Sequence, residues 1–145
     1  MSLPVLVSLP VSLQSVALAA EQSMRTAVAE LGDSALAQFA AWPAERLEAL
    51  RRVMAASDFV LQQSLRDPQM LLQLADDGEL ERRKAGGEMR QQLQDWLADC
   101  ASEDDLGSRL RRFRARQQVR IIWRDISRQA DLKETCADLS DMADA

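Results

Sequence analysis

The stretch RRFRARQQVRIIWRD, residues 111–125, decides how this chain folds. In and just beyond it an arginine recurs at every fourth position, forming what we call the arginine row: Arg112, Arg116, Arg120, Arg124 and Arg128. Because each step of four residues advances 400° around an α-helix, these side chains make one contiguous row along the helix surface. Like charges at this spacing destabilise an exposed helix by about 0.2–0.5 kcal/mol per pair. The row therefore requires anionic neighbours.

The middle of the same stretch is apolar on every side of the helix. At 100° per residue, Ile121, Ile122 and Trp123 point in three widely different directions. A helix that is apolar all round is normally internal. The pattern thus predicts a long central helix whose guanidinium groups pair with carboxylates. The acids available for pairing are Asp58, Asp76, Asp77, Asp99 and those of the last helical segment.

Charge is distributed unevenly along the chain, which leaves three interpretations of the arginine row. The 145 residues carry a net charge of −5, but residues 106–128 alone carry +7 and the rest carries −12. The pattern favours an internal helix held by Arg–carboxylate pairs. The alternatives are a surface that binds an acidic protein or a nucleotide phosphate, and a nucleic-acid interface. A remainder of −12 repels a polyanion, so we expect no nucleic acid.

Helical spacing of apolar residues continues through the rest of the chain. It predicts helices over about 12–31 and 33–41, a long helix from Pro43 to about residue 65, and a short one opened by Asp67 as N-cap and Pro68. Ser57 and Asp58 fall inside the long helix, where they suggest a buried contact to an arginine of the central helix. No stretch alternates as a β-strand does. The predicted class is all-α, a bundle of six to seven helices.

The C-terminal half of the chain contains a predicted loop, the central helix and a last helix. Residues 79–87 form the predicted loop, and Ser102 is the predicted N-cap of the central helix, which should run to about Gln129. The last helix has an apolar face opposite an acidic face that carries Asp131, Glu134, Asp138 and Asp141. The apolar face consists of Leu132, Cys136, Leu139 and Met142.

The N-terminus and the cysteines bear on organisation and location. We expect residues 1–11 to be irregular and residues 12–145 to form one helical region. No run of 18 apolar residues occurs, and Pro4 and Pro10 interrupt the apolar N-terminus, so we expect neither a membrane span nor a secretory signal. Cys100 and Cys136 fit small apolar positions of helices, which indicates reduced structural thiols and a cytoplasmic protein.

Composition removes several kinds of chemistry. The chain has no His, which excludes His-ligated zinc and the Ser-His-Asp and Cys-His catalytic arrangements within it. Gly86 and Gly87 indicate a turn, not a phosphate-binding loop. Acidic clusters at 76–81 and 99–105 fit helix caps and solvated loops better than a metal site. We therefore predict no catalytic and no metal-binding residue.

Four stretches carry a resemblance to a known family. They are AASDFV at 55–60, RDPQMLLQL at 66–74, DGELER at 77–82, and the arginine stretch with QADLKETCADLSDMADA at 129–145. Together they resemble the N-terminal region of the bifunctional glutamine synthetase adenylyltransferase/adenylyl-removing enzyme of proteobacteria. The resemblance implies a large enzyme with two nucleotidyltransferase domains, one attaching AMP from ATP and the other removing it by phosphorolysis. It also implies magnesium as cofactor, glutamine synthetase as partner, and control by the PII signalling protein and glutamine.

The family's catalytic motif is missing from this sequence. That motif is a GxxELN…SDxD pattern, and the nearest text, Ser140-Asp141-Met142-Ala143, has Ala where the second Asp stands in the family. No catalytic residue, metal ligand or cofactor can thus be assigned to this chain. We expect a truncated, inactive part of the enzyme that supports its adenylyl-removing domain, with the arginine row pairing inside the domain or at its boundary. The alternative is a free-standing helical adaptor that binds an acidic protein through the arginine row.

Overall fold

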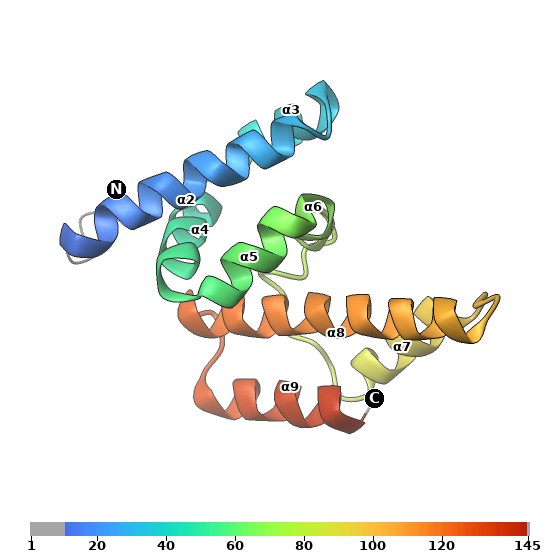
Figure 1. Cartoon of the computed structure of the whole chain (residues 1–145). Coiled ribbons are helices and arrows are strands. Elements are labelled where there is room, and N and C mark those ends of the chain that lie inside the picture. Colours follow the sequence, from blue (N-terminus) through green and yellow to red (C-terminus); the bar gives the residue numbers. More distant parts are fainter. Residues whose placement is uncertain (1–10, 145) are drawn as a thin grey trace. The chain divides into compact units, whose positions relative to one another are not determined.

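A computed structural model describes residues 11–144 and divides the chain after Asp77 into two compact units (Figure 1). The predicted irregular segment 1–11 lies, apart from Val11, outside the described residues. The prediction of an all-α fold is confirmed. The described residues form eight helices rather than six to seven, because one predicted helix is interrupted.

The first unit, described over residues 11–77, contains five helices. They are α2 (Val11–Ala29), α3 (Asp33–Ala40), α4 (Ala44–Ala56), α5 (Asp58–Arg66) and α6 (Pro68–Asp76). Helix α2 packs mainly on α4, and the core between them contains buried Met24, Val28, Leu50 and Val53. Asp67 caps α6 as predicted: its Oδ1 accepts a hydrogen bond from the Met70 amide at 3.3 Å.

The prediction of one long helix from Pro43 to about residue 65 is wrong. Ser57 takes an extended backbone conformation and separates α4 from α5. Its hydroxyl accepts a hydrogen bond from the Val60 amide at 3.2 Å, which makes Ser57 the N-cap of α5. Serine competes with the helix for backbone hydrogen bonds and so favours a helix start over a helix interior. Ser57 therefore caps the start of a helix and is not the helix-interior residue that was predicted.

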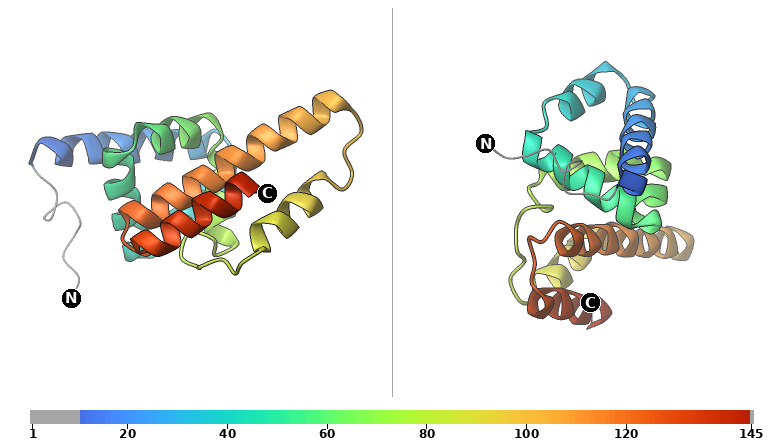
Figure 2. Two further views of the ribbon diagram at one scale, coloured as in Figure 1. Left: turned by 90° about the horizontal axis from the view of Figure 1, so that it is seen from below. Right: turned by 90° about the vertical axis from the view of Figure 1, so that its left-hand side faces the viewer.

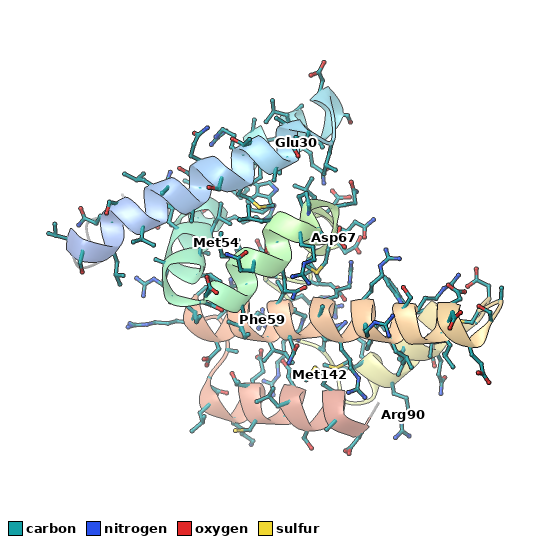
Figure 3. The ribbon with its side chains drawn as sticks, viewed as in Figure 1. Glu30, Met54, Phe59, Asp67, Arg90 and Met142 are labelled. Atoms are coloured by element: carbon teal, nitrogen blue, oxygen red, sulfur yellow. The ribbon has the colours of Figure 1, made fainter. Side chains whose placement is uncertain are left out.

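The second unit, described over residues 78–144, contains α7 (Glu88–Leu97), α8 (Glu103–Ile126) and α9 (Leu132–Asp144). Helix α9 runs back alongside α8 in the opposite direction (Figures 1 and 2), and α7 contacts both. Residues 77–87 form the loop before α7, close to the predicted 79–87. Met89, Phe113 and Ile121 make a buried cluster, and Met142 points from α9 onto it (Figure 3).

The start of α8 follows the sequence prediction. Ser102 Oγ accepts a hydrogen bond from the Asp105 amide at 3.1 Å, and Asp105 Oδ2 accepts one from the Ala101 amide at 3.2 Å. Ser102 is thus the N-cap of α8, and the Asp105 side chain binds the backbone just before it. No described helix is both long and apolar enough to cross a membrane.

The residue that follows Ser127, the C-cap of α8, has a strained backbone, and it yields a prediction. Arg128 has φ of +62°, the left-handed conformation in which glycine is favoured. We expect Arg128→Gly to raise the free energy of unfolding by about 1 kcal/mol, because an L-residue pays roughly that much in this conformation. Arg128→Ala removes the same side chain but keeps the strain, so it should give no gain. Urea unfolding of both variants checks this, and equal stabilities would contradict it.

Candidate functional site: the arginine row

The structure places the five arginines of the row in two environments. Arg116, Arg120 and Arg124 are buried, whereas Arg112 and Arg128 at the ends are exposed. Arg120 is 0% exposed, which is rare for a charged residue unless it is paired. The middle of α8 is therefore internal, and the partners of its guanidinium groups define what this site can do.

Arg120 has the most extensive set of partners. Its Nη1 donates to Asp138 Oδ2 on α9 at 3.1 Å. Its Nε donates to the carbonyl oxygen of Glu79 at 3.2 Å and its Nη2 to that of Arg82 at 2.8 Å. The planar guanidinium suits three acceptors at fixed angles. One side chain thereby joins α8 both to α9 and to the loop of residues 77–87.

Arg124 repeats this arrangement one turn further along. Its Nε and Nη2 both lie 2.9 Å from Glu134 Oε2 on α9. Its Nη1 donates to the carbonyl oxygen of Leu80 in the loop at 3.4 Å. Arg83, itself well exposed, reaches the other oxygen of Glu134 at 3.7 Å. Two successive arginines of the row thus connect the same three elements.

Arg116 and Lys84 share the buried carboxylate of Glu79. Arg116 Nη2 lies 3.1 Å from Glu79 Oε2, and Lys84 Nζ lies 2.9 Å from Glu79 Oε1. Gln92 on α7 donates to the same Oε1 at 2.8 Å and accepts a hydrogen bond from Lys84. Burial opposes ionisation of Glu79, but the hydrogen bond and charge of Lys84, with Gln92 and Arg116, lower its pKa overall. Burial lowers the pKa of Lys84, against the effect of Glu79.

The two ends of the row have different surroundings. The Arg112 guanidinium lies over the ring of Trp96, 6.0 Å from its centroid, and Arg128 is the strained residue described above. Asp99, one of the acids expected to pair with the row, instead binds Arg109, which lies outside it. Two acids of the last helix, Glu134 and Asp138, contact the row as expected.

The predicted orientation of the last helix is wrong over residues 132–139, although Met142 of the predicted apolar face does pack inward. Glu134 and Asp138, assigned to the side opposite the apolar face, are buried against α8. Leu132, Leu139 and Cys136, assigned to the apolar face, are exposed. The reason is the arginine row: α8 presents buried guanidinium groups to α9, and unpaired burial of such charges costs several kcal/mol, more than a few apolar contacts return. Both cysteines are free thiols, and Cys136 is not the enclosed apolar position expected.

Glu79 and Lys84 were missed by the sequence reasoning. Both lie in the loop of residues 77–87, where a mixed run of charges is normally solvated. No periodicity singles them out, because loop residues follow none. The structure shows why a further carboxylate is needed: three arginines of the row are buried, whereas the last helix buries two acids.

The pair of Arg82 and Glu88 gives a prediction on pH. Arg82 Nη1 donates to Glu88 Oε1 at 3.0 Å, and this side-chain hydrogen bond, against partial burial, lowers the pKa of Glu88 to about 2. A carboxyl with a lowered folded-state pKa stabilises the fold above its unfolded value of 4.5, and this contribution is lost as the pH falls towards 2. We expect the carboxyl of Glu88 to titrate near 2 by NMR, and at a clearly higher pH in Arg82→Ala, because the hydrogen bond from Arg82 is the largest cause of the lowered pKa. An unchanged midpoint in the variant would refute the pairing.

These contacts pair each buried arginine with a carboxylate of the same unit. Among residues 11–144, no group of three or more cysteine and acidic residues could hold a metal ion. What the arrangement does chemically is hold α8, α9 and the loop together. The second unit is thus an all-helical scaffold built around a charge-paired internal helix.

Comparison with known proteins identifies the family. Residues 47–145 match the family described as glutamate-ammonia ligase adenylyltransferase. The chain belongs to this family.

Three relatives, each named bifunctional glutamine synthetase adenylyltransferase/adenylyl-removing enzyme, are similar over all 145 residues. The chain is 61% identical to the protein of Pseudomonas aeruginosa, 60% to that of Pseudomonas syringae pv. tomato and 48% to that of Pseudomonas putida. Each alignment covers 100% of this chain but only 15%, 15% and 14% of the length of the respective relative. No solved structure matches the chain.

Proposed function

We propose that this chain is the N-terminal helical part of an enzyme that adenylylates and deadenylylates glutamine synthetase, and that it supports the adenylyl-removing domain. The observation that carries the proposal is the 61% identity, along the entire chain, to a relative named for both activities. The internal charge pairing of α8 favours a supporting role, since a rigid helical unit can position a neighbouring catalytic domain.

Magnesium and ATP belong to other parts of this enzyme in our proposal. The described residues offer no cluster of metal-ligating groups, and the sequence lacks the paired-Asp motif. We further propose that the enzyme acts in the cytoplasm under control of the PII protein. Neither glutamine synthetase nor the PII protein is assigned a binding residue in this chain.

In this proposal the arginine row is a pairing element. Arg116, Arg120 and Arg124 use their donors on acceptors within the second unit. Arg112 and Arg128, at the exposed ends, are the members available at a boundary with a catalytic domain. The alternative of a free-standing adaptor that binds an acidic protein through the row is not favoured, because the three middle guanidinium groups are buried and already paired with carboxylates of the second unit.

The test is phosphorolytic release of AMP from adenylylated glutamine synthetase. We expect the full-length enzyme that contains this sequence to release AMP in the presence of phosphate and magnesium, and the 145-residue chain alone to release none. Release of AMP by the chain alone would overturn the supporting role. A full-length enzyme without activity on glutamine synthetase would overturn the function itself.

A further inference from the structure

Helix α9 has two sectors of opposite character. At 100° per residue, its charged residues lie together on one side, and a sector of about 160° carries no charge. The members of this uncharged sector are Leu132, Thr135, Cys136, Leu139, Ser140, Met142 and Ala143. A helix of this kind normally turns its uncharged sector towards the core of its own domain.

In α9 most of the uncharged sector faces outward, and only its edge at Met142 packs on the core. Glu134 and Asp138 are only 6% and 4% exposed, whereas Leu132 is 77% and Leu139 is 46% exposed. Cys136 and Ala143 are exposed as well. We call these four exposed residues, Leu132, Cys136, Leu139 and Ala143, the outer face of α9. Grouped apolar side chains on a surface indicate an interaction site more often than single ones do.

The chemistry of the outer face limits what covers it. The uncharged sector offers no positive charge to pair with an acidic protein, a phosphate or a nucleic acid. An apolar protein surface is the partner that gains from contact with it. The face is also small, four side chains on a helix of 13 residues.

The size of the face decides between a second copy and a covalently connected segment. A stable association of separate molecules buries about 1,200–2,000 Å², which four side chains cannot supply. A segment of the same polypeptide needs much less area, because the connection gives it an effective concentration of roughly millimolar. Relatives that match all of this chain, α9 included, are far longer, since the chain covers 15% of them.

We propose that the outer face of α9 docks against an apolar surface of the remaining polypeptide of the full-length enzyme. This inference rests on the proposed function, that the chain is part of that enzyme. The buried acidic side of α9 is fixed to α8 by Arg120 and Arg124, so the outer face is presented as a rigid surface. The inward pairing thus orients the helix, and the outward apolar residues make the contact.

Cys136 provides a native probe of this surface. We expect N-ethylmaleimide to label Cys136 readily in the 145-residue chain and at least about tenfold more slowly in the full-length enzyme, measured by mass spectrometry of the labelled peptide. The control is Lys133→Cys, an exposed position beyond the uncharged sector of the same helix, which should label equally in both. Equal labelling of Cys136 in the two proteins overturns the proposal. If labelling of Cys136 in the 145-residue chain slows as the concentration of that chain rises, the proposal is overturned in favour of self-association.

A charge placed on the face gives a second, independent readout. Leu139→Asp should leave the unfolding temperature of the 145-residue chain unchanged but lower that of the full-length enzyme. The matched control is Ala137→Asp, exposed on the charged side of α9, which should change neither. An enzyme that releases AMP from glutamine synthetase while Cys136 labels freely overturns the docking alone. An enzyme that is inactive on glutamine synthetase overturns the proposed function, whatever the labelling.

Discussion

Replacing Glu79 with Gln is expected to lower the free energy of unfolding by about 3–5 kcal/mol, because the buried charges of Arg116 and Lys84 then lose their shared carboxylate. Glutamine keeps the size of the side chain, so the loss reports charge and not a cavity. Equilibrium urea unfolding of the chain at neutral pH measures it.

Two further variants sharpen this experiment. Glu103→Gln makes the same chemical change at an exposed residue of α8 and should cost less than about 1 kcal/mol. Adding Lys84→Met to Glu79→Gln removes one of the orphaned cations and should recover part of the stability. A loss below about 1 kcal/mol for Glu79→Gln would show that the carboxylate is not needed to neutralise the row.

Replacing Trp123 with Ala is the second substitution with a large expected effect. Trp123 is 0% exposed, and removing a fully buried indole should cost about 3–5 kcal/mol in unfolding free energy. The control is Leu132→Ala, since Leu132 is 77% exposed and should cost less than about 1 kcal/mol. Similar losses for the two variants would mean that α8 is not internal, or that α9 turns its apolar face inward.

The sequence predicted α8 well because two signals agreed there. Apolar residues all round Trp123 indicated an internal helix, and the spacing of the arginines required acids beside it. Capping residues predicted the starts of α6 and α8 correctly, because the side chains of Asp67 and Ser102 accept hydrogen bonds from backbone amides close by in sequence. These features are local, and local features can be read from a sequence.

What the sequence did not predict depends on contacts between distant residues. The orientation of α9 follows from the guanidinium groups that α8 presents to it, and hydrophobic periodicity alone assigns the opposite face. Glu79 lies 37 residues before its partner Arg116, in a loop without periodicity. The break at Ser57 was missed for another reason, because the apolar spacing continues from α4 into α5 and conceals the cap.

The pairing of the arginine row is tested by a double-mutant cycle on Arg120 and Asp138, with Arg120→Met, Asp138→Leu and the double variant compared by urea unfolding. The two side chains are 0% and 5% exposed, so each single change leaves a buried charge or acceptor without its partner. We expect a coupling energy of about 1–3 kcal/mol. A coupling energy near zero, with the single changes costing no more than surface substitutions, would contradict a buried, charge-paired α8.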